Sequence, residues 1–144
     1  MSEARLRLVV DASVGIKLFI NETDSDKVQT LFSKLNDDPP AVFYVPDLFY
    51  IECANILVKT MRRYGRCLED SKADLADLQF LGFKSTPTVE LMEEALNLAV
   101  EKGLTAYDAC YAVLARRLEI PLVTADLQLV RSIDWAVWLG DFKV

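Results

Sequence analysis

The sequence predicts a three-layer α/β/α sandwich with a mainly parallel central sheet. Short apolar runs of strand length alternate with longer segments of helical periodicity along the chain. The first run, residues 6–10, has the apolar character of a strand buried on both faces. The expected order of elements is β-α-α-β-α-α-β-α-α-β-α-β. Helices between successive strands are the connections that parallel pairing requires, so this order favours the α/β class.

The 144 residues are expected to form one domain over residues 1–144, because a chain of this length can bury an adequate core. The apolar run after Arg5 and Arg7 is interrupted by Asp11 and is too short for a signal peptide. No stretch approaches the roughly 18 uninterrupted apolar residues of a membrane span. We therefore expect a soluble, cytoplasmic protein.

Composition narrows the possible chemistry. The chain contains no histidine, which excludes Ser-His and Cys-His nucleophile pairs, an imidazole base and His-ligated zinc. Cys53, Cys67 and Cys110 form no close pair, so neither a disulfide framework nor a zinc knuckle is indicated. The net charge of −6 argues against tight nucleic-acid binding through the whole surface. Any hydrolysis must use carboxylates, hydroxyls, lysines or a metal bound through oxygen.

Turn residues and apolar spacing define the elements of the first half. Residues 21–25 supply a turn, and Pro46 suits the first turn of a long helix that Gly65 ends. On that helix Leu48, Ile51, Ala54 and Val58 make one apolar row, which Phe49, Cys53, Ile56 and Leu57 widen. The expected elements are a strand at 6–10, helices at 14–20 and 26–35, a strand at 42–45 and a helix at 46–64.

The second half is predicted in the same way. Gly103 ends one helix, and Thr105 and Asp108 have the spacing of a capping box at the start of the next. The expected elements are a helix at 68–81, a weak strand at 83–86, a helix at 89–101, a helix from 105, a strand at 122–124, a short helix at 127–132 and a strand at 137–139.

Four acids are predicted to meet at one edge of the sheet. Asp11 and Asp126 follow strands, whose carboxyl ends form the ligand-binding edge of a parallel sheet, while Glu52 and Asp108 lie near helix starts at that edge. Each acid alone has an ordinary explanation. Asp11 can cap a helix, Asp108 fits the capping box, and Glu52 shares a polar stripe with Asn55 that typically faces water. Their convergence favours a polar site.

The motifs that contain these acids resemble those of the PIN-domain ribonucleases, specifically the VapC-type toxins of bacterial and archaeal toxin–antitoxin pairs. The resemblance spans nearly the whole chain in the family's order, and the ordered set is specific where no single motif is. The motifs are Val10-Asp11-Ala-Ser13, Glu52-Cys-Ala-Asn55, Tyr107-Asp108-Ala-Cys-Tyr111-Ala112 and Thr124-Ala-Asp126.

The resemblance implies a PIN-like fold and a metal-dependent endoribonuclease. It makes Asp11, Glu52, Asp108 and Asp126 the quartet that holds one or two Mg²⁺ or Mn²⁺ ions. It makes Ser13, Asn55 and Thr124 the polar residues that orient the acids. It also implies an antitoxin partner and a homodimer. Two positions after Asp126 the family often has a basic residue, whereas this chain has Gln128, which leaves the acid intact but supplies no positive charge.

Metal chemistry suits such a cluster. Neighbouring carboxylates raise one another's pKa, and a divalent cation relieves their repulsion. Oxygen ligands suit Mg²⁺ or Mn²⁺, and a metal-bound water can attack a phosphodiester without help from histidine. Attack by water rather than by the ribose 2′-hydroxyl predicts products with a 3′-hydroxyl and a 5′-phosphate.

A local basic run offers a contact for an RNA polyanion. Such a run is usually a solvated helix end, yet Lys59 shares the stripe of Glu52 and could line a groove that leads to the metal. The run comprises Lys59, Arg62, Arg63, Arg66 and Lys72, with Arg116 and Arg117 as a second pair. We hypothesise that it binds RNA phosphates.

Two alternatives from other functional classes remain. An Asp after the first strand also opens phosphatases of the haloacid-dehalogenase type, but those have a second Asp where this chain has Ser13. The other alternative is a catalytically silent PIN-like module that binds RNA or a protein. The sequence leaves the RNA target open, and it does not separate a toxin from a housekeeping nuclease.

Overall fold

A computed structural model describes residues 5–20 and 24–143. The predicted turn at 21–25 lies partly outside the described residues. Five parallel strands form one sheet in the order β3-β2-β1-β4-β5. The strands are β1 (Arg7–Val10), β2 (Val42–Pro46), β3 (Lys84–Thr86), β4 (Leu122–Thr124) and β5 (Ala136–Trp138). The predicted fold class and order of elements are confirmed.

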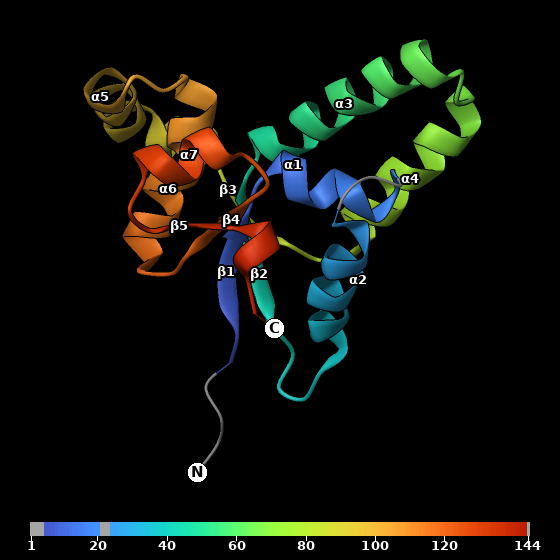
Figure 1. Ribbon diagram of the computed structural model, residues 1–144, viewed down its shortest axis with the longest axis horizontal. Coiled ribbons are helices and arrows are strands. Elements are labelled where there is room, and N and C mark those ends of the chain that lie inside the picture. The colour runs from blue at the N-terminus through green and yellow to red at the C-terminus, as the bar shows by residue number, and fades with distance from the viewer. Residues whose placement is uncertain (1–4, 21–23, 144) are drawn as a thin grey trace.

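Helices cover both faces of the sheet. In Figure 1 the strands lie between α5 and α6 on one side and α1 to α4 on the other. The helices are α1 (Ala12–Gly15), α2 (Ser25–Ser33), α3 (Leu48–Tyr64), α4 (Leu68–Phe80), α5 (Met92–Lys102), α6 (Ala106–Leu118) and α7 (Leu127–Ser132). Short 3₁₀ turns are η1 (Ile16–Leu18), η2 (Lys34–Asn36), η3 (Thr88–Leu91) and η4 (Leu139–Asp141). No helix in the described part of the chain has the length and apolar character to cross a bilayer.

The central strand β1 and helix α6 form the middle of the core. Leu8, Val9 and Val10 are fully buried, and Val9 lies opposite Tyr44 of β2 and Leu122 of β4. In α6 every residue from 109 to 115 is buried. This helix packs against β1, β2 and β4, because its many alanines let the helix backbone approach the sheet closely. Cys53 and Cys110 are buried core residues, as the apolar pattern suggests.

Helix α3 differs from its prediction at two points. Pro46 is the last residue of β2 instead of the first turn of α3, and Ile51 of the predicted apolar row is 61% exposed. The buried positions are Leu48, Phe49, Cys53 and Leu57. The physical reason is that α3 extends away from the sheet and pairs with α4 as a projecting hairpin (Figure 1), so only a narrow face of α3 is covered.

A close contact joins α1 to α3. A Cβ atom on Gly15 would lie 2.7 Å from the ring of Phe49, well inside van der Waals contact. Only glycine allows this approach without a shift of the ring. The contact fixes the segment that follows β1 against the helix that carries Glu52, so it helps set the geometry of the predicted site.

Candidate active site

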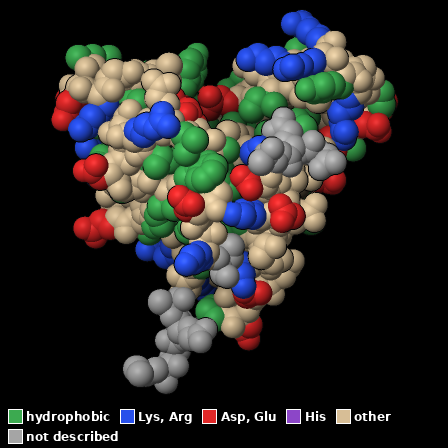
Figure 2. All heavy atoms as spheres, in the orientation of Figure 1, with side chains coloured by type: hydrophobic (Ala, Val, Ile, Leu, Met, Phe, Trp, Pro, Cys, Tyr) green, Lys and Arg blue, Asp and Glu red, His purple; other side chains and the backbone are tan. Residues whose placement is uncertain are grey.

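The four predicted acids lie at the carboxyl edge of the sheet. Asp11 follows β1 and Asp126 follows β4, and these two strands are neighbours in the sheet. Glu52 lies in the second turn of α3, and Asp108 in the first turn of α6. Figure 2 shows the molecule hollowed between the α5 side and the α3–α4 hairpin, with acidic side chains at the floor of the hollow.

Asp11 is buried and held by several hydrogen bonds. Its Oδ1 accepts from the Ser13 hydroxyl at 2.6 Å and from the backbone N–H of Val14 at 3.2 Å. Its Oδ2 accepts from the Thr124 hydroxyl. Burial raises the pKa of Asp11 to about 6, although these bonds to the charged form oppose the rise, and the nearby charge of Asp108 adds to it. Asp11 is therefore a fixed carboxylate whose ionisation is costly.

The same two hydroxyls fix the loop that carries Asp126. The Ser13 oxygen accepts from the backbone N–H of Ala125 at 3.1 Å, and the Thr124 oxygen accepts from that of Asp126 at 3.1 Å. Asp126 itself is exposed and caps α7 by accepting from the N–H of Gln128 at 2.9 Å. Each hydroxyl thus donates to Asp11 and accepts from the next loop, which couples the ends of β1 and β4.

Glu52 and Asp108 form the other half of the cluster. Both are partly buried, and Glu52 Oε1 accepts from the Tyr111 hydroxyl at 2.6 Å. Burial raises the pKa of both carboxyls. The charge of Asp108 adds to the rise for Glu52, and the charge of Asp126 adds to the rise for Asp108. Asp108 therefore interacts electrostatically with each of the other three acids.

The acids share one neighbourhood without converging on one point. Within residues 5–20 and 24–143, no three acidic or cysteine side chains form a preassembled group that could hold a metal ion. The donor set of carboxylate oxygens nevertheless fits a hard divalent cation.

The residues predicted to support the acids have different surroundings. Ser13 and Thr124 contact Asp11 directly. Asn55 lies one turn beyond Glu52 on α3 but is exposed, and its side chain has no hydrogen bond to a described residue. Tyr111, which the sequence motifs contain without assigning a role, is the residue that contacts Glu52. Tyr111 follows Asp108 by three residues, and residues at this spacing lie on the same face of a helix. This spacing is the signal in the sequence that places Tyr111 beside the acids.

The predicted basic run lies on the projecting hairpin. Lys59, Arg62 and Arg63 are exposed on the outer part of α3, and Figure 2 shows lysine and arginine side chains gathered at the end of the hairpin. Arg66 is engaged instead in an ion pair with Asp74 of α4. Lys72 lies 3.8 Å from Glu69 in an exposed pair. The first three residues are therefore the available cations of this run.

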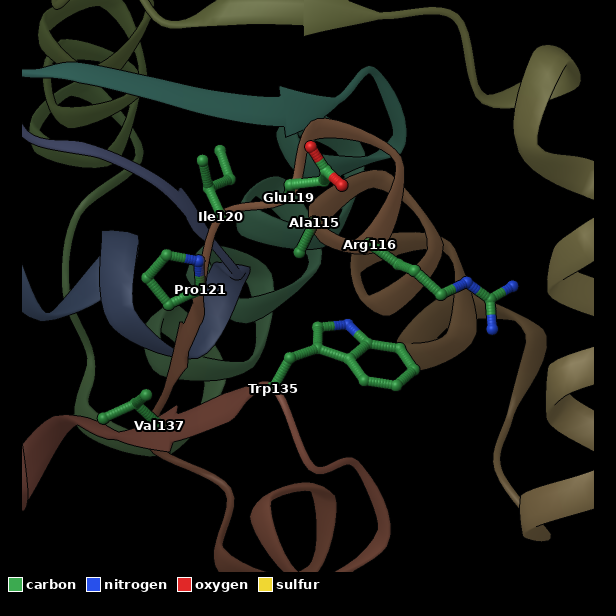
Figure 3. A pocket seen from close by; sticks show the side chains of 7 residues that line it. All are labelled: Ala115, Arg116, Glu119, Ile120, Pro121, Trp135 and Val137. Atoms are coloured by element: carbon green, nitrogen blue, oxygen red, sulfur yellow. The ribbon is translucent and has the colours of Figure 1, made fainter.

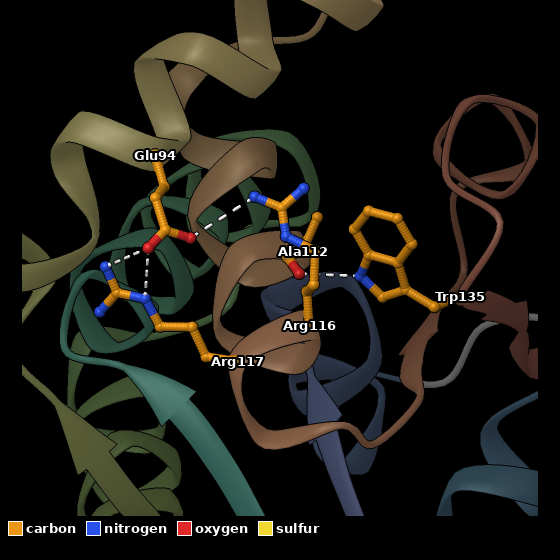
Figure 4. Close-up of polar contacts among 5 residues, drawn as sticks. All are labelled: Glu94, Ala112, Arg116, Arg117 and Trp135. Atoms are coloured by element: carbon orange, nitrogen blue, oxygen red, sulfur yellow. Dashed lines mark hydrogen bonds and ion pairs between the residues drawn. The ribbon is translucent and has the colours of Figure 1, made fainter.

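The second basic pair is not part of the acidic site. Arg116 and Arg117 both bind Glu94 of α5, at 3.4 and 2.8 Å, and Arg116 also lies over the ring of Trp135 (Figure 4). Arg116 and Trp135 line a pocket of about 480 Å³ that includes Pro121, just before β4 (Figure 3). This pocket lies at the amino ends of β4 and β5, opposite the edge that carries the acids.

An apolar pocket lies on the acidic side of the sheet. It has a volume of about 330 Å³ and takes its lining from the start of α3, from η3 and from the starts of α5 and α6. Tyr107, the neighbour of Asp108, is one of its walls and is 61% exposed. The pocket therefore borders the two helices that carry Glu52 and Asp108.

Comparison with known proteins identifies the family. The PIN-domain model matches residues 8–134. The chain is 32% identical over 130 residues to "Ribonuclease VapC3" of Pyrobaculum aerophilum, which covers 88% of this chain and 95% of that protein. The crystal structure of PAE2754 from the same organism has a TM-score of 0.69 at 27% identity, over 95% of this chain and 93% of that one. A toxin–antitoxin complex from Klebsiella pneumoniae shares the fold, with a TM-score of 0.65 at 16% identity over 95% of this chain and 99% of that one. The resemblance seen in the sequence motifs is confirmed, and this chain belongs to the PIN-domain family.

Proposed function

We propose that this chain is a divalent-metal-dependent endoribonuclease and the toxin of a type II toxin–antitoxin pair. The observation that carries the proposal is the set of four carboxylates at one edge of the sheet, three of which have raised pKa values. Perturbed acids in a hollow are typical of a catalytic site. The relative from Pyrobaculum aerophilum is named a ribonuclease, and the structure from Klebsiella pneumoniae is a toxin–antitoxin complex. Both names support the same assignment.

The acids would hold one or two Mg²⁺ or Mn²⁺ ions. Asp11, Glu52, Asp108 and Asp126 supply only oxygen donors, which these ions prefer. When bound, such an ion acidifies a water and offsets negative charge on the phosphate and on the leaving oxygen. Ser13 and Thr124 hold the Asp11 carboxylate in place, and the Thr124 hydroxyl also accepts from the backbone N–H of Asp126. Attack by water gives products with a 3′-hydroxyl and a 5′-phosphate.

RNA would approach along α3. Lys59, Arg62 and Arg63 lie farther out on the helix that carries Glu52, and ten residues of helix between Glu52 and Arg62 span about 15 Å. The basic side chains would bind phosphates about 10 to 17 Å along the helix from Glu52, while the scissile phosphate lies at the acids. Arg66 is the least available member of the predicted cluster because Asp74 pairs with it.

Two protein partners complete the proposal. An antitoxin would block the acidic hollow, and a second copy of the chain would form a homodimer. The described surface offers an apolar stripe for the second copy at helical spacing, formed by Val89, Met92, Leu96 and Val100 along η3 and α5. These side chains are between 37% and 79% exposed. A stripe of this kind on a helix is typical of a protein interface.

The experiment that tests the function is cleavage of a circular RNA. A circle has no ends, so only an endonuclease linearises it. We expect the parent chain to cut it with added Mg²⁺ or Mn²⁺, and to stop when a chelator is added. The Asp11→Asn variant should leave the circle intact over the time in which the parent chain linearises it. End-labelling of the products then checks for the 5′-phosphate.

Two other outcomes would change the assignment. RNA that is bound but not cut by the parent chain, with no effect of either metal on the melting temperature, would indicate the silent binding module instead. Cleavage that persists with excess chelator would contradict the role of the metal. A ligand that binds only the native state raises the melting temperature, so thermal unfolding with and without Mn²⁺ separates these cases.

A further inference from the structure

Tyr111 links the two helices that carry the second pair of acids. It lies three residues after Asp108 on α6, and its side chain is 1% exposed. Its hydroxyl donates a hydrogen bond of 2.6 Å to Oε1 of Glu52, which is 59 residues away in the sequence and lies on α3. Among the described residues this is the one side-chain hydrogen bond between α3 and α6.

We propose that Tyr111 is a positioning residue that holds Glu52 in the orientation needed to bind the metal. The proposal rests on the proposed function, since it concerns the same cluster of acids. A glutamate has three side-chain torsions, and a partly buried one without a partner samples several rotamers. The bond from Tyr111 selects one of them. It occupies Oε1 and leaves Oε2 as the oxygen free to bind a metal.

Two features of the surroundings support this role. Tyrosine is a large side chain with only two torsions, and the ring of Tyr111 is enclosed by the core, so its hydroxyl has a fixed position. The other half of the site already uses this arrangement, because Ser13 and Thr124 hold Asp11 in the same manner. Asn55, the residue predicted to support the acids from α3, makes no such bond. Tyr111 therefore supplies from α6 the support that α3 itself lacks.

The test removes a single hydroxyl. Tyr111→Phe keeps the ring in the core and deletes only the donor to Glu52. Tyr107→Phe is the matched control, because Tyr107 lies on the same helix, is 61% exposed and has no side-chain hydrogen bond to a described residue. Outer hydrogen bonds of this kind are worth about 10–100-fold in metal affinity. Calorimetric titration with Mn²⁺ should show affinity at least about tenfold weaker for Tyr111→Phe and unchanged for Tyr107→Phe.

Kinetics separate positioning from a structural role. With saturating Mn²⁺, Tyr111→Phe should recover most of the parent kcat, while its half-saturating Mn²⁺ concentration rises by the same factor as the Kd. Crystals of metal-free Tyr111→Phe should show the Glu52 carboxylate displaced or in several rotamers. A lower melting temperature with parent Mn²⁺ affinity would assign Tyr111 to the core alone and overturn the proposal.

The crystal structure of the variant also keeps the two proposals apart. If the parent chain neither binds Mn²⁺ nor cuts RNA, the proposed function fails. The position of Glu52 in Tyr111→Phe then still decides whether the hydroxyl holds this side chain. A carboxylate that stays in place without the hydroxyl overturns the positioning role, whether or not the chain is a nuclease.

Discussion

The two halves of the acidic cluster are supported in different ways. Asp11 accepts three hydrogen bonds, two of them from hydroxyls that also fix the neighbouring loop. Glu52 accepts one, from a tyrosine on another helix. The first half is built by short segments that leave adjacent strands, so local chain geometry orients it. The second half depends on how two long helices pack. We therefore expect changes in the first half to affect metal binding most.

The largest effect should come from Asp11→Asn. The variant lacks the buried carboxylate charge, so metal-assisted cleavage should fall by about 10³-fold or more, equivalent to several kcal/mol of lost transition-state stabilisation. Without metal at pH 7.5 the variant should be more stable than the parent by about 1–3 kcal/mol, because it buries an amide instead of a charge. Single-turnover cleavage and urea unfolding measure the two effects. Activity within tenfold of the parent would remove Asp11 from the proposed mechanism.

A pair of supporting residues tests the comparison directly. Ser13→Ala deletes a donor to Asp11 and an acceptor for Ala125, so Mn²⁺ affinity should fall by about 10–100-fold. Asn55→Ala removes an exposed side chain without a hydrogen bond and should change the affinity by less than about twofold, since such surface changes have small effects. Calorimetry measures both variants. Equal losses in the two variants would show that Asn55 acts in the metal-bound state.

The pKa of Asp11 predicts the pH dependence of metal binding. Below about pH 6 the carboxyl holds a proton that the metal must displace. Mn²⁺ affinity should therefore fall by about tenfold for each pH unit below that point, and more gently above it. Calorimetry at constant ionic strength from pH 5 to 8 checks this. The control is Asp11→Asn, whose residual Mn²⁺ affinity should show no change of slope with pH near pH 6.

Without metal, stability should change in the opposite direction. The folded chain holds a proton on Asp11 up to about pH 6, whereas the usual pKa of the group is 3.8. The folded state thus binds more protons between these values, and the free energy of unfolding decreases as pH rises through this window. The rise in the pKa of Asp11 corresponds to a loss of about 3 kcal/mol in the free energy of unfolding across this window. Urea unfolding at pH 4 to 7 tests the sign, and a rise in stability across the window would contradict the burial of an ionised Asp11.

A several-fold effect on RNA binding should come from the basic residues of the hairpin. Arg62→Gln with Arg63→Gln should weaken RNA binding several-fold and reduce the slope of log K against log salt by about 1.4, as expected for two lost contacts to single-stranded phosphates. Arg116→Gln with Arg117→Gln removes the same charge at the opposite edge of the sheet, where Glu94 pairs with both residues. The slope should then stay near that of the parent. An Asp11→Asn background keeps the RNA intact during the measurement.

Local signals allowed most of the fold to be predicted. The end of α3 at Tyr64 follows from Gly65, which has a positive φ, and the start of α6 follows from Thr105, whose hydroxyl accepts from the N–H of Asp108. Pro46 was placed wrongly because a proline suits a helix start and a strand end equally well. Because Glu52 and Asn55 lie on one polar stripe of α3, the sequence predicted the same surroundings for both side chains. The structure separates them, because Tyr111 reaches only Glu52.

The sequence by itself determined the class of fold, the edge of the sheet at which the acids lie and the motifs that carry them. These features follow from the spacing of apolar residues, from helix-capping residues and from the common direction of parallel strands. Each of these signals lies within a short stretch of sequence. Only the tertiary structure decided which neighbours hold each acid, that Arg66 is bound to Asp74, and that Tyr111 reaches Glu52 across 59 residues. The reason is physical, because hydrogen bonds between distant segments depend on how helices pack and rotate against one another, which a single sequence does not encode as a local pattern.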